Sequence, residues 1–210
     1  MRNRIGRTAW QALALCAAAL FAHPAFSQAA RQFSFAYDQP PTTAYGIAAN
    51  IFDAKLKELS GGKMSINQFP GAQLGQEPQM LQKMRAGDID FVITSTANAS
   101  TLAPQAGVFS LHFIFRDQQH LARVLADPGI ATEFRAMVKD QVQGAQVLGL
   151  MTMGLRNMYS KQEIRSVDDI KGRKVRVQAT KTEDTHFPAY GAQTVHMPFG
   201  DVSRRCRRAW

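Results

Sequence analysis

Apolar and polar residues follow regular patterns along residues 31–94. Phe33, Phe35 and Tyr37 alternate with polar neighbours, which is the spacing of a β-strand. The expected elements are strands at 31–37, 64–69 and 89–94, and amphipathic helices at 44–59 and 77–86. The last strand is mostly apolar, as expected for a strand buried on both faces of a parallel sheet. The order strand, helix, strand, helix, strand therefore predicts an α/β fold with a parallel sheet.

The second half of the chain has shorter apolar runs. An apolar segment rich in phenylalanine occupies 108–115. The patterns predict helices at 118–126, 130–141 and 182–190, a helical turn at 167–170, and strands at 147–151, 155–160, 174–178 and 194–196. Residues 203–210 have no apolar periodicity, so we expect no helix after Val202.

The N-terminus has the features of a cleaved secretory signal at residues 1–27. Three arginines precede the short apolar run Ala12–Ala22, and Ala25 and Ser27 suit a cleavage site before Gln28. The run has about eleven residues, whereas roughly twenty are needed to cross a bilayer. We therefore expect export to the periplasm.

The two cysteines lie outside the expected exported body. Leu13–Cys16 faintly resembles the lipobox of a lipoprotein, which is a minor alternative because Leu15 is large for that position. Cys206 lies near the C-terminus. We expect neither a disulfide nor a cysteine-bound metal in residues 28–202.

The formal charge of +9 is concentrated at the two ends of the chain. The signal holds three arginines and residues 203–210 hold four, with no acidic residue in either segment, which leaves +2 for residues 28–202. Basic residues in that body are mixed with acidic ones and form no stripe with aromatic residues. This distribution opposes a nucleic-acid-binding function.

The sequence lacks the motifs of the common enzyme classes. Its five histidines show no H-E-x-x-H spacing, and G-x-S-x-G, P-loop and G-x-G-x-x-G motifs are absent. Asp168 and Asp169 are adjacent, and we expect them to cap a helical turn. We expect no catalytic site, metal or cofactor.

Several short motifs follow one another in a fixed order between residues 69 and 200. They are Phe69–Gly75 (FPGAQLG), Gly87–Asp90, His112–Asp117 (HFIFRD), Gly154–Arg156, Asp169–Val177 (DIKGRKVRV), Gly191–Ala192 and Met197–Gly200 (MPFG). In this order the chain resembles the periplasmic solute-binding proteins of the TRAP transporter (DctP) family over nearly all of residues 32–202. His112 departs from the proline usual in that family.

The resemblance implies a type II periplasmic-binding-protein-like fold with two lobes that close on a ligand. Residues 28–152 would form the first lobe and 153–202 the start of the second. The protein would be a monomer that captures a small organic anion, most relatives binding carboxylates, and hands it to TRAP membrane permease subunits. The alternatives are a binding protein of another uptake system and, less favoured, a secreted enzyme.

Two arginines are candidates for carboxylate binding. The resemblance implies that Arg176 clamps the ligand carboxylate and that Arg156 supplies a second donor. A guanidinium presents a planar fork of donors that matches a carboxylate and stays charged. By spacing alone, both residues are equally compatible with exposed positions on edge strands.

Four polar residues complete the expected ligand site. Gln178 shares a strand face with Arg176, and Glu77 begins a helix, where it serves either the ligand or the helix terminus. Ser95 and Asn98 follow the strand at 89–94, and loops at such strand ends commonly hold ligands. Two interpretations of Tyr45 are open: it packs on a ligand, or it packs in the core.

Residues 203–210 (SRRCRRAW) depart from the family pattern. One set of codons for them, read in a shifted frame, encodes Ala-Ala-Leu-Gln-Thr-Gly-Val, which resembles the helix that follows MPFGDV in the family. We therefore expect an aberrant tail produced by a frameshift and a second lobe that is incomplete. Such a chain is expected to bind ligand weakly or not at all and to be prone to aggregation or proteolysis.

Overall fold

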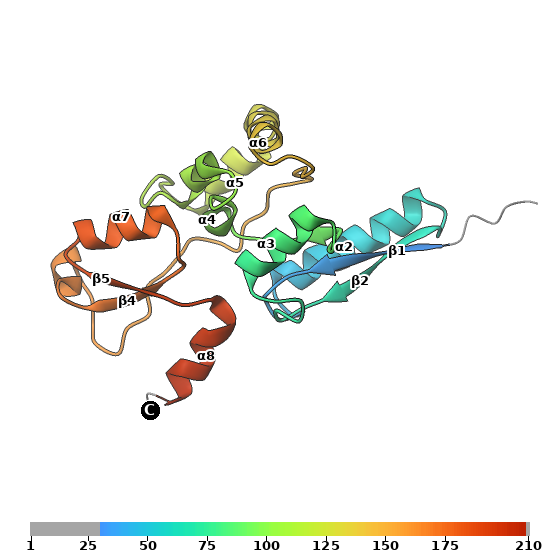
Figure 1. Ribbon diagram of the computed structural model, residues 1–210. Helices are drawn as coiled ribbons and strands as arrows, with labels where there is room; N and C mark the ends of the chain where they lie inside the picture. Colours follow the sequence, from blue (N-terminus) through green and yellow to red (C-terminus); the bar gives the residue numbers. More distant parts are fainter. Residues whose placement is uncertain (1–29, 209–210) are drawn as a thin grey trace, which may run out of the picture. The chain divides into compact units, whose positions relative to one another are not determined.

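The computed structural model describes residues 30–208, with side chains described as far as residue 205. The predicted signal at 1–27, the Cys16 alternative, the side chain of Cys206 and the last two residues lie outside this description. In chain order the elements are β1 (Arg31–Ala36), α2 (Ala44–Leu59), β2 (Met64–Phe69), α3 (Glu77–Ala86), β3 (Phe91–Val92), α4 (Thr96–Ala99), η1 (Pro104–Ser110), α5 (Gln118–Ala126), α6 (Pro128–Gln141), η2 (Val167–Ile170), β4 (Lys174–Val177), α7 (Lys181–Ala189), β5 (Gln193–His196) and α8 (Phe199–Arg208) (Figure 1).

The first sheet is parallel, with strand order β2-β1-β3. Phe33 of β1 lies opposite Ile66 of β2, and Phe35 lies opposite Phe91 of β3. The predicted parallel α/β arrangement of the first half is therefore confirmed. Its third strand is shorter than the predicted 89–94, because only Phe91–Val92 pairs with β1.

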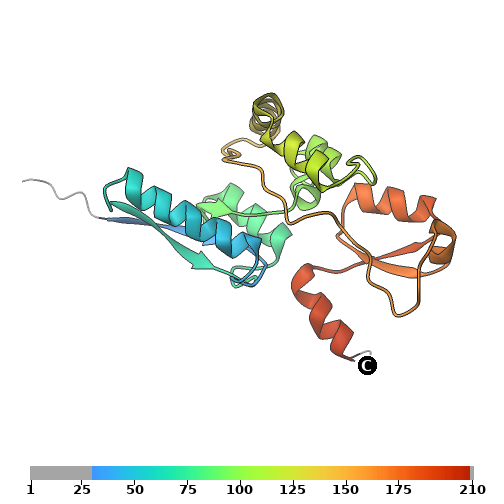
Figure 2. The ribbon, with the colours of Figure 1, turned by 180° about the vertical axis from the view of Figure 1, so that it is seen from behind.

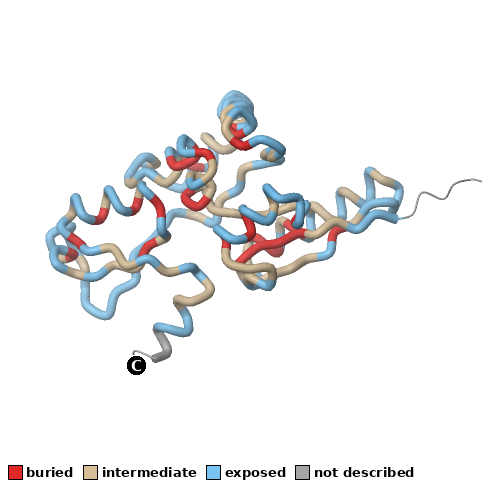
Figure 3. Tube along the Cα trace, in the orientation of Figure 1, coloured by how far each residue is buried: buried red, intermediate tan, exposed pale blue. Residues whose placement is uncertain are grey.

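Helices α2 and α3 cover opposite faces of this sheet (Figures 1 and 2). Phe35 and Tyr37 pack with Tyr45 and Ala49 of α2 on one face. The intervening residue of β1, Ala36, packs with Met80 of α3 on the other face. Alternation of side chains along β1 thus places the two cores, and the end of the strand is buried (Figure 3).

A helical segment follows, with a core of its own. The segment 104–110 forms the 3-10 helix η1, and its Ala106 packs with Phe134 and Val138 of α6. The predicted helices 118–126 and 130–141 appear as α5 and α6, the latter two residues longer. Asp127 fixes the start of α6 because its carboxylate accepts a hydrogen bond of 2.7 Å from Gly129 N.

The second sheet consists of the parallel strands β4 and β5. Its core contains four buried residues, Ile170, Val177, Phe187 and Ala192. Phe187 comes from α7, which carries Pro188 inside it and ends at Ala189. As expected, Asp169 caps the turn η2, accepting hydrogen bonds from Ser166 N at 2.8 Å and Arg165 N at 2.9 Å.

The predictions of two strands are wrong, and so is the prediction that no helix follows Val202. Residues 147–151 and 155–160 form no strand, and the side chains of Met151, Met153 and Leu155 are exposed. A strand needs a hydrogen-bonded neighbour, which a short apolar run cannot supply by itself. Helix α8 also continues past Val202. Within it, Asp201 forms an ion pair with Arg204, one turn later.

Among residues 30–208, no helix combines the length and the apolar character needed to span a lipid bilayer.

Candidate functional site

Glu77 is a buried carboxylate that accepts hydrogen bonds from the segment following β3. Its side chain is almost fully buried, although it lies in the first turn of α3. Ser95 donates to it from the backbone nitrogen at 3.1 Å and from Oγ at 2.8 Å, and Asn98 Nδ2 also donates to it. The N-terminus of α3 is instead capped by Gln79, whose Oε1 accepts a hydrogen bond of 2.9 Å from Gln76 N. Glu77 therefore organises the loop after β3 rather than its own helix terminus.

Gln178 links this cluster to the second sheet. It directly follows β4, and its Nε2 donates to Ser95 Oγ at 3.0 Å and lies 3.5 Å from Glu77 Oε2. Its Oε1 accepts a hydrogen bond of 3.3 Å from Arg156 Nη2. One side chain thus connects residues separated by about a hundred positions in sequence.

Arg156 is paired with a buried carboxylate that the sequence did not single out. Its Nη1 forms an ion pair with Glu183 Oε1, and only 1% of the Glu183 side chain is exposed. Glu183 lies in the first turn of α7, next to Thr180, which caps that helix. Burying a carboxylate without a partner is costly, so the ion pair stabilises both groups.

Arg176 is held differently. Its side chain leaves β4 and donates to the backbone oxygen of Met197, from Nε at 2.9 Å and from Nη2 at 2.5 Å. Among the described residues no carboxylate forms an ion pair with it. Burial, followed by the neighbouring charge of Arg156, lowers the pKa of Arg176 from its ordinary value. The group remains a cation.

Asp38, after β1, and Tyr45, in α2, lie close to Glu77. Asp38 directly follows the buried end of β1, and burial, reinforced by the charge of Glu77, raises its pKa to about 6. Tyr45 packs in the core on Tyr37, with ring centroids 6.4 Å apart, which answers the question left by the sequence. Burial, followed by the charges of Glu77 and Asp38, raises the pKa of Tyr45.

The structure joins five of the six predicted site residues in one hydrogen-bonded network. Its predicted members are Glu77, Ser95, Asn98, Gln178 and Arg156. Arg176 lies outside the network but is close enough for the charges of Arg156 and Glu77 to shift its pKa. The role of these residues in ligand binding stays a prediction.

Sequence reasoning missed Asp38 and Glu183. Asp38 follows the first strand as Ser95 follows the third, so its place at the carboxyl end of a parallel strand was a usable signal. Glu183 lies in the first turn of a helix, as Glu77 does, but nothing in the sequence showed that it would be buried against Arg156.

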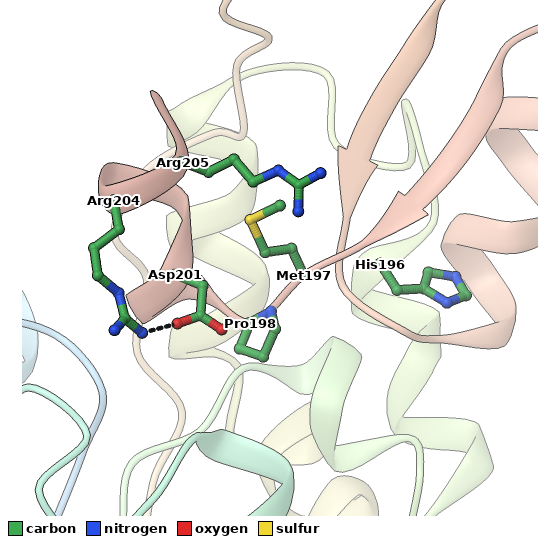
Figure 4. Close-up of a pocket in the computed structure, with 6 residues that line it drawn as sticks. All are labelled: His196, Met197, Pro198, Asp201, Arg204 and Arg205. Atoms are coloured by element: carbon green, nitrogen blue, oxygen red, sulfur yellow. Dashed lines mark hydrogen bonds and ion pairs between the residues drawn. The ribbon is translucent and has the colours of Figure 1, made fainter. Parts of the chain in front are cut away.

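A surface hollow of about 360 Å³ lies beside this region, lined by His196, Met197, Pro198, Asp201, Arg204 and Arg205. None of the six predicted site residues lines it. Figure 4 shows Arg204 paired with Asp201 and the ring of His196 directed away from that pair. His196 contacts Asp184 instead, at 2.6 Å. The hollow adjoins the site through Met197, whose backbone oxygen accepts hydrogen bonds from Arg176.

Within the part of the chain that the structure describes, no three histidine, cysteine, aspartate or glutamate side chains gather in a way that could hold a metal ion.

Curated proteins that resemble this chain include two that are 30% identical to it. The chain is 30% identical over 190 residues to the 2,3-diketo-L-gulonate-binding periplasmic protein YiaO of Escherichia coli, covering 90% of this chain and 57% of that protein. It is 30% identical over 162 residues to the C4-dicarboxylate-binding protein DctB of Bacillus subtilis, covering 76% of this chain and 45% of that protein. The chain thus spans about half the length of these relatives.

A solved structure agrees in fold as well as in sequence. The TRAP periplasmic solute-binding protein of Xanthobacter autotrophicus Py2, solved with bound β-D-galacturonate, superposes with a TM-score of 0.79 at 30% identity. The match covers 85% of this chain and 59% of that protein. The family pattern of bacterial extracellular solute-binding protein family 7 matches residues 35–206. The chain therefore belongs to bacterial extracellular solute-binding protein family 7, the DctP family.

Proposed function

We propose that this chain forms the ligand-capturing part of the periplasmic receptor of a TRAP transporter. It binds a small organic acid through the carboxylate and delivers it to membrane permease subunits. The segment 1–27 directs export, residues 28–152 belong to the first lobe, and the second lobe begins at residue 153. The receptor acts as a monomer.

One observation carries this proposal: Arg176 is a half-buried guanidinium whose partner is a backbone carbonyl and not a carboxylate. Partial burial strengthens the attraction of such a cation for an anion because less water screens the charge. Bonding to Met197 fixes the orientation of the guanidinium before a ligand arrives, which lowers the entropy lost on binding.

The surroundings of Arg176 supply donors and acceptors for the rest of an organic acid. Gln178, Ser95 and Asn98 are neutral groups able to exchange hydrogen bonds with hydroxyl or carbonyl oxygens. The names of the relatives agree with this chemistry, since diketogulonate, C4-dicarboxylates and galacturonate all carry a carboxylate. Membership of a solute-binding family favours a receptor over a secreted enzyme.

Arg176→Ala tests the proposal. We expect at least one organic acid from a panel of keto acids, sugar acids and dicarboxylates to raise the melting temperature of the chain. A ligand at one hundred times its Kd stabilises the native state by about 2.7 kcal/mol. The substitution is expected to weaken binding about 100-fold, because it removes one partner of a partly desolvated charge pair.

Arg165→Ala is the matched control, since Arg165 is an exposed arginine that pairs with Glu163 away from the site. This variant should bind the same acid with unchanged affinity. NMR titration of the guanidinium Nε–H signals extends the test to millimolar ligand. A folded chain that binds no acid at that concentration, or equal binding by both variants, contradicts the proposal.

A further inference from the structure

The two arginines of the site differ in the charge that they offer a ligand. Arg156 is paired with the carboxylate of Glu183, while Arg176 is bonded to the backbone oxygen of Met197. The first positive charge is therefore paired with a carboxylate, whereas the second is in no ion pair with any described residue. An incoming anion meets one uncompensated guanidinium instead of two.

Glu183 supplies a buried negative charge that is paired with Arg156. Its side chain is buried, and its second oxygen lies 3.6 Å from His112 Nε2. The other nitrogen of that histidine lies 3.1 Å from the hydroxyl of Tyr190. Because α7 holds Glu183 beneath Arg156, a ligand carboxylate cannot displace it without exposing or orphaning a buried carboxylate.

His112 does not cancel this charge at neutral pH. Burial lowers the pKa of His112 from its ordinary value, more than the attraction of Glu183 raises it. The ring of His186 lies 4.4 Å from that of His112, and its charge also opposes protonation of His112. Arg156 therefore remains the cation that balances Glu183.

Two further carboxyl groups face the site, one from the start of α3 and one from the segment after β1. Glu77 is buried beneath Ser95 and Asn98, and Asp38 is buried at the end of β1. The region thus contains two guanidinium groups and three carboxyl groups. Arg156 and the three carboxyl groups all shift the pKa of Arg176. Of the two arginines only Arg176 is in no ion pair with a carboxylate, so a second negative charge on a ligand meets carboxyl groups and not an available cation.

We propose that the site selects singly charged, hydroxylated carboxylic acids over dicarboxylates, and that Glu183 determines this specificity. The inference rests on the proposed function, since it describes the ligand held by Arg176. The carboxylate of Asp38 accepts hydrogen bonds from ligand hydroxyls, and the same group repels a second ligand carboxylate. Attraction at Arg176 and repulsion elsewhere together define the preferred acid.

Isothermal titration of the chain with three acids separates charge from size. D-Galacturonate is a hydroxylated monoanion, succinate is a dianion, and monomethyl succinate has the succinate backbone with one charge. We expect galacturonate to bind most tightly, and the ester to bind about tenfold more tightly than succinate. This comparison uses the unsubstituted chain, so it does not depend on whether a variant folds.

Glu183→Gln then tests the residue itself. The amide keeps the shape of the side chain and a hydrogen bond to Arg156 but removes the counter-charge. We expect succinate to gain about tenfold in affinity while galacturonate changes less than about threefold. Glu163→Gln removes an equal charge from an exposed position and should alter neither affinity.

The outcomes distinguish this inference from the function on which it rests. Binding of succinate as tight as that of its monomethyl ester overturns the inference and leaves the receptor function standing. A second outcome is that the Glu183→Gln variant folds and keeps the original ratio of succinate affinity to galacturonate affinity. That result would show that Glu183 does not determine the specificity. Failure of every acid to bind overturns the proposed function and, with it, this inference.

Discussion

At the scale of single residues, the chain retains a buried carboxyl group that weakens the folded state at neutral pH. Asp38 is only 5% exposed, and its pKa rises from 3.8 to about 6, first because of burial and second because of Glu77. The folded state therefore binds more protons than the unfolded state between these values. Stability falls as pH rises from about 4 to 6 and stays lower above that range. Such a cost is typical of functional sites.

Asp38→Asn is expected to raise the free energy of unfolding at pH 7.5 by roughly 2 kcal/mol. The amide is neutral, so its burial does not carry the cost of burying a charged carboxylate. The gain should shrink as the pH falls from 6 toward 4. Urea unfolding at several pH values measures it, with the exposed Asp140→Asn as the control for charge removal. An equal gain at pH 4 and pH 7.5 would assign the effect to packing instead.

The prediction of individual site residues succeeded where a local rule existed. Ser95 and Asn98 follow a parallel strand, and Gln178 shares a strand face with Arg176; these rules led to residues that the structure connects. Glu183 could not be found this way. Its importance comes from contacts with Arg156 and His112, which lie 27 and 71 positions away in the chain.

At the scale of elements, helix and strand boundaries were predictable where sequence pattern and termination signals agreed. The predicted bounds of α2, β2, α3 and α5 match the structure. The two strands expected within 147–160 do not form, although short apolar runs suggested them. A helix satisfies its hydrogen bonds locally, whereas a strand depends on a neighbour, so a sequence pattern identifies helices more securely.

The start of α2 depends on a glycine in contact with the preceding turn. A Cβ at Gly46 would lie 2.0 Å from the backbone oxygen of Pro41. Replacing glycine by alanine inside a helix ordinarily stabilises it by about 1 kcal/mol. Here the contact is with backbone atoms, which cannot rotate away as a flexible side chain does, so the steric cost outweighs the helix preference.

We therefore expect Gly46→Ala to lower the free energy of unfolding by roughly 1–3 kcal/mol, the cost typical of overpacking. Chemical denaturation followed by circular dichroism measures the change. Gly149→Ala is the control, because no atom lies within 4 Å of a Cβ built there. A stability for Gly46→Ala at or above that of the parent would show that the turn at Pro41 moves freely.

At the scale of the whole molecule, the two sheets have unequal support. The three-stranded sheet has an apolar cluster on each face, whereas the β4–β5 sheet has two strands and one cluster of four buried residues. Two parallel strands have few hydrogen bonds to share, and a sheet of this size is marginal without further packing. The division of the chain into two lobes at residue 153 was expected from the resemblance and stays a prediction.

This inequality predicts different rates of amide hydrogen exchange. Amides of β1, which has a hydrogen-bonded neighbour on both sides, are expected to exchange at least about tenfold more slowly than those of β4 and β5, because local opening of a small core costs less free energy. Exchange followed by mass spectrometry at neutral pH measures both regions in one sample. Equal protection would mean that the sheets open only together. In that case the polar contacts through Gln178 and Arg156 would couple them more strongly than their hydrogen bonds indicate.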